Sequence, residues 1–165
     1  MQEINKIMVA LAFSEYSKGI FTYAAKLATC ANSELILANI INKRDLEAVE
    51  KVVSMGYEVD GNHYIEEIEN ERKELLNQYI KDTSFPIERI KTVFRVGNPI
   101  DELLKLTVEE EVDMIVMGPK GRTDLVHILI GSVAEKIFRK SPVTVVSYRS
   151  DKIAERLKKR ILRHK

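Results

Sequence analysis

Gly118-Pro119-Lys120-Gly121 and, after nine intervening residues, Gly131-Ser132 form the most informative stretch of this chain. Residues 112–117 before it are mostly apolar, and residues 133–140 after it carry apolar side chains at helical spacing. Glycines at the carboxyl end of a strand let backbone amides come closer to a ligand than a side chain would permit. A Gly-Ser pair at the start of a helix adds N–H donors and the positive end of the helix dipole. The stretch therefore predicts an anion-binding loop, most simply for the phosphates of a nucleotide.

Apolar runs alternate with helical patterns along the rest of the chain. Strands are expected at 7–12, 34–41, 87–96, 112–117 and 143–148, and helices at 14–28, 64–81, 99–108 and 133–140. Ser14 is the expected N-cap of the first helix, and residues 43–61 are mixed, with a short helix ending near Gly56. Apolar strands separated by helices are typical of a parallel sheet covered on both faces. Ligands of such sheets bind beyond the carboxyl ends of the strands, where the glycine stretch falls.

Length and composition limit the class of protein that this chain can be. A chain of 165 residues has the length of one domain, and 45% hydrophobic with 31% charged residues is typical of a globular protein. The single cysteine, Cys30, cannot form an internal disulfide, which favours a reducing compartment. No apolar run approaches the roughly 20 residues of a membrane helix, and the first residues lead into a strand rather than a signal peptide. We therefore expect a cytoplasmic protein.

With these elements in place, the chain resembles the universal stress protein family. The resemblance extends from Lys6 to Val146, and its most specific part is the spacing G-x2-G-x9-G-S, met here by Gly118, Gly121, Gly131 and Ser132. The turn Val96-Gly97-Asn98-Pro99 resembles the family's G-x-P turn. The resemblance implies an α/β fold of three layers, with a doubly wound, five-stranded parallel sheet in the order 3-2-1-4-5. This fold is Rossmann-like, of the adenine nucleotide alpha hydrolase type, and would occupy residues 1–148.

The resemblance also implies a site for ATP, or for ADP or AMP, with Mg²⁺ held through the phosphates. Carried onto this chain, the phosphate cradle is formed by Gly118, Lys120, Gly121, Gly131, Ser132 and Val133. The wall for base and ribose is formed by Ala10, Leu11, Ala12 and Ile40, with Met117 nearby. Ala134 stands where many members have Thr or another small residue. Arg122 is either a further phosphate contact or a solvated loop cation.

Ala12 departs from the family pattern, because the nucleotide-binding branch usually carries an Asp at this position. A missing hydrogen-bond partner removes ~1–3 kcal/mol, which is about tenfold to a hundredfold in affinity. The function expected is an ATP-binding regulatory or sensor module that acts as a homodimer. Two alternatives stay open: a protein-interaction module of the same fold without nucleotide, and a slow ATP hydrolase. No acid or histidine in the motif could serve Ser132 as a base, so at most weak ATPase activity is expected.

Partners are expected at the C-terminal end. The strand that begins at Val143 and ends at Tyr148 is apolar and at a sheet edge, which favours pairing with a second copy, as the resemblance also implies. Residues 149–165 hold eight basic and two acidic residues, and Ile153, Leu157 and Ile161 give them an amphipathic helical pattern. This extension is expected to pack on the domain or the dimer mate, or to dock on an acidic partner or anionic surface. Nucleic acid is not expected, because the extension has no aromatic residue to stack on bases.

Three further residues carry structural expectations only. Cys30 is expected to be a small buried residue near the end of the first helix. Arg72 is expected to lie with neighbouring glutamates on a solvated helix face. His127 is expected to be packed or to face a partner rather than to act in catalysis.

Overall fold

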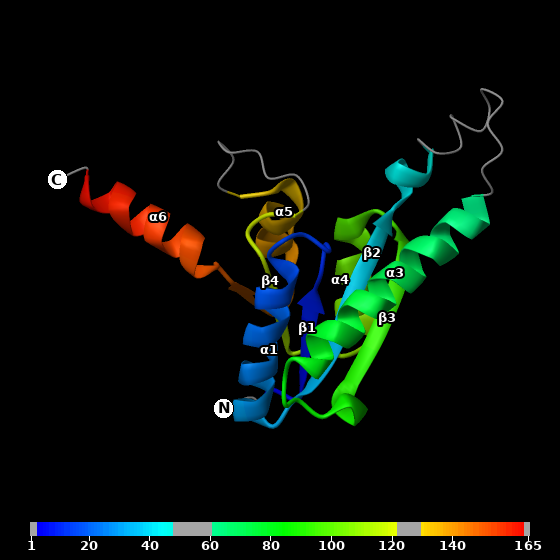
Figure 1. The fold of residues 1–165 in the computed structure, drawn as a ribbon, viewed down its shortest axis with the longest axis horizontal. Helices are drawn as coiled ribbons and strands as arrows, with labels where there is room; N and C mark the ends of the chain where they lie inside the picture. Colours follow the sequence, from blue (N-terminus) through cyan, green and yellow to red (C-terminus); the bar gives the residue numbers. More distant parts are fainter. Residues whose placement is uncertain (1–2, 48–60, 122–129, 164–165) are drawn as a thin grey trace.

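The computed structural model describes residues 3–47, 61–121 and 130–163, excluding the side chains of residues 61 and 62. Within these residues one parallel sheet contains β1 (Lys6–Ala10), β2 (Glu34–Asn42), β3 (Ile90–Gly97), β4 (Met114–Met117) and β5 (Thr144–Ser147). The strand order is β3-β2-β1-β4-β5 (Figure 1). The predicted parallel sheet and its order are therefore confirmed.

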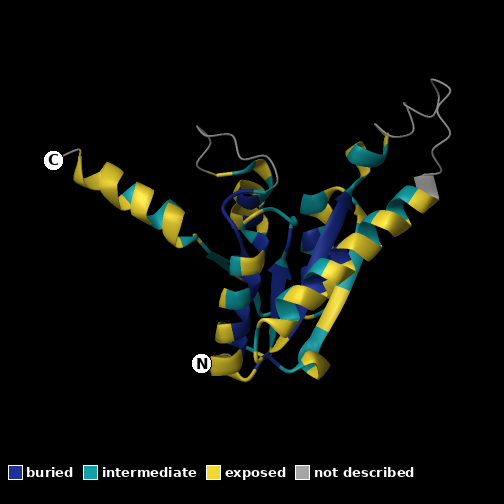
Figure 2. Ribbon diagram, viewed as in Figure 1, coloured by how far each residue is buried: buried dark blue, intermediate teal, exposed yellow. Residues whose placement is uncertain are grey.

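Helices cover both faces of this sheet. They are α1 (Ser17–Ala31), α3 (Gly61–Lys81), α4 (Pro99–Glu109) and α5 (Ser132–Lys140), followed by α6 (Asp151–Leu162) beyond the last strand. One apolar cluster joins α1 and α3 to the sheet, and a second joins α4 and α5 to its other face. The central strands β1, β2 and β4 are largely buried, whereas the edge strands β3 and β5 contain no buried residue (Figure 2). The predicted three-layer, doubly wound architecture is thus confirmed.

The alternation of side chains along β1 shows how the two cores are built. Ile7 and Val9 belong to the cluster under α1 and α3, whereas Met8 between them belongs to the cluster under α4 and α5. All three are at most 1% exposed. Because successive residues of a strand point to opposite faces, a continuous apolar run serves both layers at once.

Several element boundaries differ from the sequence prediction. Helix α1 begins at Ser17 with Tyr16 as its N-cap, so the prediction of Ser14 was wrong. The N–H of Ser14 donates to Oγ of Ser17 at 3.0 Å, which places Ser14 in the preceding turn. Strand β3 begins at Ile90, because residues 87–89 form a short 3-10 helix after Pro86. Residues 43–47 are helical, and the rest of the predicted 43–56 helix lies outside the described residues.

Two of the structural expectations for single residues were wrong. Cys30 is exposed, because it lies on the outer side of the last turn of α1. Arg72 is buried, with 8% of its surface exposed, although its neighbours on α3 are solvated. His127 lies outside the described residues.

The helix predicted in the basic extension is confirmed as α6, and it projects away from the rest of the molecule (Figure 1). None of its described residues is buried, and Ile161 and Leu162 are both 69% exposed. The helix therefore does not bury its apolar stripe on its own domain. What this stripe packs against stays a prediction.

Glu102 on α4 gives the fold a measurable pH dependence. Its carboxylate accepts a hydrogen bond from Nζ of Lys105 at 2.9 Å and lies 3.5 Å from Nη1 of Arg95 on β3. The hydrogen bond to Lys105 and the charges of Lys105 and Arg95 lower the pKa of Glu102, against an opposing effect of desolvation. A lowered folded-state pKa adds stability that is present above the unfolded value of about 4.3 and is lost as the pH falls.

We therefore expect Glu102→Gln to lower the free energy of unfolding by about 0.5–1 kcal/mol at pH 7, the range of partly exposed ion pairs. The difference from the unaltered protein should shrink as the pH falls below 4. Urea unfolding at pH 7, 5 and 3 measures it. An equal difference at all three pH values would contradict an ionic contribution of Glu102.

Candidate functional site

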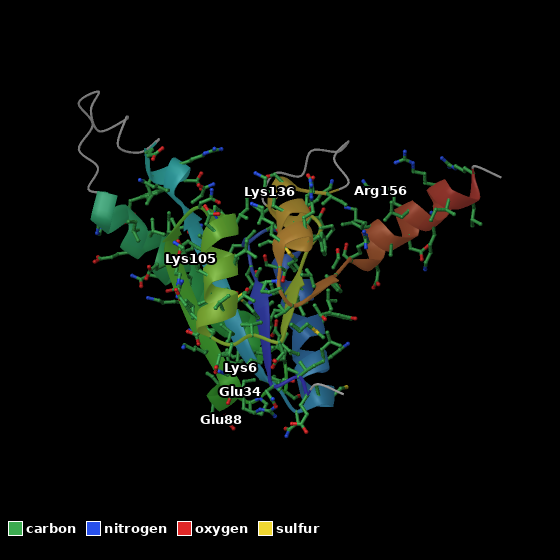
Figure 3. All side chains as sticks on the ribbon, turned by 180° about the vertical axis from the view of Figure 1, so that it is seen from behind. Lys6, Glu34, Glu88, Lys105, Lys136 and Arg156 are labelled. Carbon is green, nitrogen blue, oxygen red and sulfur yellow. The ribbon has the colours of Figure 1, made fainter. Side chains whose placement is uncertain are left out.

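The site begins where β1 and β4 end side by side. Ala10, the last residue of β1, is paired with Met117, the last residue of β4. The chain order reverses between these two central strands, which is where open parallel sheets bind their ligands. The strands begin at the opposite edge of the sheet, where Lys6 starts β1 and Glu34 starts β2. In Figure 3 these two residues lie at one end of the molecule, and Lys136 of α5 lies at the other. The segments after Ala10 and Met117 therefore leave the sheet at a common edge.

The two glycine elements of the motif are in direct contact. The N–H of Gly131 donates to the carbonyl oxygen of Pro119 at 2.7 Å. A Cβ built on Gly131 would lie 3.5 Å from Cα of Lys120 and 3.7 Å from the backbone nitrogen of Gly121. The tertiary structure thus brings together two elements that nine residues separate in the sequence.

This contact changes which backbone donors can face a ligand. Because the N–H of Gly131 is bonded to Pro119, it is not available to a phosphate in this structure, contrary to the simplest form of the predicted cradle. Gly131 is the N-cap of α5, and the N–H of Glu135 donates to its carbonyl oxygen at 3.0 Å. The N–H groups of Ser132, Val133 and Ala134 precede this first intrahelical bond and sit at the positive end of the helix dipole.

The three glycines of the motif are not equivalent. A Cβ on Gly118 would lie 3.0 Å from Cδ1 of Ile20 and 3.2 Å from the carbonyl oxygen of Lys120, so a side chain there would force these neighbours to shift by a few tenths of an ångström. A Cβ on Gly121 would meet only Cβ of Ala12, at 3.8 Å, among the described residues. Gly131 has φ −75°, which any residue adopts. Contacts with the described residues therefore disfavour a side chain at 118 but not a Cβ at 121 or 131.

Of the residues predicted to contact base and ribose, Ala12 lies beside this loop. Leu11 is 4% exposed, and its N–H donates to the carbonyl oxygen of Ala38 at 2.9 Å, which extends the β1–β2 pairing by one residue. Ala12 follows at half-buried depth and faces Gly121. Ile40 is 9% exposed in the α4–α5 core. The turn after β1 thus lies against the glycine loop at Ala12, and the contacts of these residues with a nucleotide stay a prediction.

The other predicted site residues differ in how far they are buried. Met117 and Ala134 are 5% and 3% exposed and belong to the α4–α5 core. Their apolar side chains therefore lie beneath the site and offer it no polar contacts. Ser132 is exposed at the start of α5, and Val133 is half-buried. Lys120, predicted to contact the phosphates, is 8% exposed. Arg122 lies outside the described residues.

Three residues at this edge were not predicted from the sequence. Nδ2 of Asn39 donates to the carbonyl oxygen of Leu11 at 2.6 Å, and Oδ1 of Asn39 accepts from Nη1 of Arg72. The Arg72 guanidinium also lies 5.5 Å from the centre of the Phe13 ring. Asn39 could have been noticed as the one amide inside the apolar strand 34–41. Nothing in the sequence pattern pairs it with Arg72, 33 residues away.

The described residues hold no group of three or more His, Cys, Asp or Glu side chains that could bind a metal ion. Among the helices of the described ranges, none is both long and apolar enough to span a membrane.

The chain matches a known family along most of its length. The model of the universal stress protein family matches residues 3–149. Universal stress protein MJ0577 of Methanocaldococcus jannaschii is 33% identical over 153 residues, which cover 86% of this chain and 94% of that protein. The solved structure of MJ0577 superposes with a TM-score of 0.73 at 27% identity, covering 91% of this chain and 99% of that chain.

Two more distant solved structures share the fold and contain adenine nucleotides. A universal stress protein in complex with cAMP has a TM-score of 0.59 at 23% identity and covers 90% of this chain and 98% of that chain. The universal stress protein of Archaeoglobus fulgidus in complex with dAMP has a TM-score of 0.53 at 17% identity and covers 90% and 100%. Because the family model matches residues 3–149, nearly the whole chain, and a family member is 33% identical over 153 residues, this chain belongs to the universal stress protein family.

Proposed function

We propose that this universal stress protein binds an adenine nucleotide, ATP in the first place, and acts as a regulatory module in the cytoplasm. The observation that carries the proposal is the contact between the two glycine elements, joined by the 2.7 Å hydrogen bond from Gly131 to Pro119. This bond places the N-terminus of α5, with the N–H groups of Ser132, Val133 and Ala134, beside the loop after β4. The cAMP and dAMP in two proteins of the same fold support an adenine nucleotide as the guest.

The phosphates would lie between the glycine loop and the first turn of α5. N–H groups at a helix N-terminus favour anions through hydrogen bonds and the helix dipole. At Gly121 and Gly131 a Cβ would make only ordinary van der Waals contacts with the described residues, so those contacts do not explain the glycines. A ligand that approaches the backbone closely gives a physical reason for both glycines.

The base and ribose would lie toward Ala12 and Ile40, on the β1 side of the loop. Main-chain groups would have to recognise the adenine, because Ala12 has no polar side chain. Mg²⁺ would be held by phosphate oxygens. Since Ser132 lies exposed at the start of α5 and no described contact joins it to a base, we propose that ATP hydrolysis is slow or absent.

Titration calorimetry with ATP, ADP, AMP and GTP tests this proposal, together with mass spectrometry of gently purified protein. We expect one adenine nucleotide per chain, with ATP bound at least about tenfold more tightly than GTP, because backbone groups at the base wall distinguish the two bases. Failure to bind any adenine nucleotide at millimolar concentration, with none co-purified, would reject the proposal.

We further propose that the protein is a homodimer joined through β5. This strand ends the sheet, and the described residues provide it with a neighbour only on the β4 side. An open strand edge presents unpaired N–H and C=O groups that a second copy can satisfy.

A second candidate function is protein interaction without a nucleotide, and the exposed α6 is the observation that favours it. Its exposed Leu162 and its many basic residues fit an acidic surface of another protein. The full chain should then bind polyglutamate at low salt, and a chain that ends after residue 149 should not. Equal binding by both chains, or binding to anionic vesicles alone, would reject an acidic protein as the partner of α6.

A further inference from the structure

We propose that Asn39 and Arg72 are positioning residues that hold the turn at residues 11–13 and thereby shape the nucleoside end of the site. The inference rests on the proposed function for its consequence in nucleotide binding. Its structural part concerns the protein without ligand. Neither residue belongs to the glycine motif.

The turn after β1 adopts a backbone conformation that needs support. Leu11 still pairs with Ala38 in the sheet, but Phe13 has φ 51°, in the left-handed region. A bulky residue that is not glycine rarely adopts this conformation unless its surroundings impose it. Contacts from outside the turn must therefore favour it.

Asn39 supplies the first of these contacts, and its amide is suited to it. The side chain is 4% exposed, donates through Nδ2 to the Leu11 carbonyl at 2.6 Å and accepts through Oδ1 from Arg72. A guanidinium can only donate and a carbonyl can only accept, so the orientation of the amide is determined. An aspartate could keep the bond to Arg72 but not the one to Leu11.

Arg72 supplies the second contact, at Phe13. It reaches from α3, is 8% exposed and places its guanidinium 5.5 Å from the centre of the Phe13 ring. One cation thus donates an N–H to Asn39 and lies over the Phe13 ring. The start of the turn at Leu11 and its end at Phe13 are both connected to α3 through Arg72.

Ala12 lies between these two anchored residues, and its Cβ is 3.8 Å from the position a Cβ would take on Gly121. The turn is therefore the wall that faces the glycine loop. Because Ala12 offers no carboxylate, recognition of the nucleoside depends on where the backbone of this turn lies. Loosening the turn should weaken binding of the nucleoside part and leave binding of the phosphates nearly unchanged.

The experiment compares Asn39→Asp and Arg72→Met with a matched control, Arg89→Met. Arg89 makes the same two kinds of contact at the start of β2, since it donates to the Ser33 carbonyl at 2.6 Å and lies 5.3 Å from the Phe85 ring centre. Hydrogen exchange of residues 11–14 is measured in the protein without ligand. We expect at least about tenfold faster exchange in Asn39→Asp and Arg72→Met and no change there in Arg89→Met.

Affinity is measured for ATP and for tripolyphosphate. In the first two variants ATP should bind about tenfold more weakly, and tripolyphosphate should change less than about twofold. Should Arg72→Met fail to fold, Arg72→Lys keeps the charge but loses the planar group, and it should show the same pattern in weaker form.

Unchanged exchange of residues 11–14 would overturn the proposal whether or not the protein binds nucleotide. Faster exchange with unchanged ATP affinity would overturn the link to the site. If the unaltered protein bound no adenine nucleotide, the proposed function would fail, and the exchange rates would still decide whether Asn39 and Arg72 hold the turn.

Discussion

Replacement of Gly121 by valine is expected to weaken ATP binding at least about a hundredfold, or about 2.7 kcal/mol, and to leave the melting temperature within about 2 °C. The nearest described atom to a Cβ at this position is Cβ of Ala12, at 3.8 Å, so the protein has room for the first carbon of the side chain. The same side chain would project into the space between the turn after β1 and the glycine loop. A nucleotide that uses this space would be displaced.

Calorimetric titration with ATP and a thermal melt of the same samples measure both parts of this prediction. Gly118→Val is the matched contrast, because its Cβ would lie 3.0 Å from Ile20 and 3.2 Å from the Lys120 carbonyl. Overpacking of this kind typically costs about 1–3 kcal/mol, so this variant should lose stability. If Gly121→Val bound ATP as tightly as the unaltered protein, the nucleotide would not lie against the loop.

Replacement of Ser147 by proline is expected to convert the proposed homodimer into a monomer. The N–H of Tyr148 donates to the Met117 carbonyl of β4 at 2.9 Å. Because successive residues of a strand direct their N–H groups to opposite sides, the N–H of Ser147 points to the open edge of the sheet. Proline removes this donor in both copies and places its ring at the edge, while the bonds to β4 are kept. We expect dimer affinity to fall at least about a hundredfold.

Light scattering after size exclusion measures the mass, which should fall from about twice 18.9 kDa to 18.9 kDa. Ser147→Ala is the control, since it keeps the N–H and should remain dimeric. The Oγ of Ser147 is buried without a hydrogen-bond partner among the described residues, so removing this hydroxyl should not destabilise the chain. A proline variant that stays dimeric would show that the copies meet elsewhere.

The parallel sheet could be predicted because the alternation of strands and helices is a pattern local in the sequence, whereas the strand order came from the resemblance to the family. Residues 34–41 are apolar almost without interruption, which favours a strand buried on both faces, and β2 is indeed buried over most of its length. The glycine spacing located the loop after β4 and the start of α5 for the same reason. Boundaries were less accurate, as at Ser14, because a turn residue and a helix cap share the same preferences.

The sequence by itself thus determined the family, the parallel sheet and the edge at which a ligand would bind. Only the tertiary structure decided which groups at that edge are already in use. The Gly131 N–H is bonded to Pro119, and Arg72 is buried against Asn39 and Phe13. These contacts join residues that lie far apart in the chain, so no local pattern encodes them. Hydrogen-bond partners depend on where the folded backbone places each donor, which is why residue types and spacing could mark the site but not its free donors.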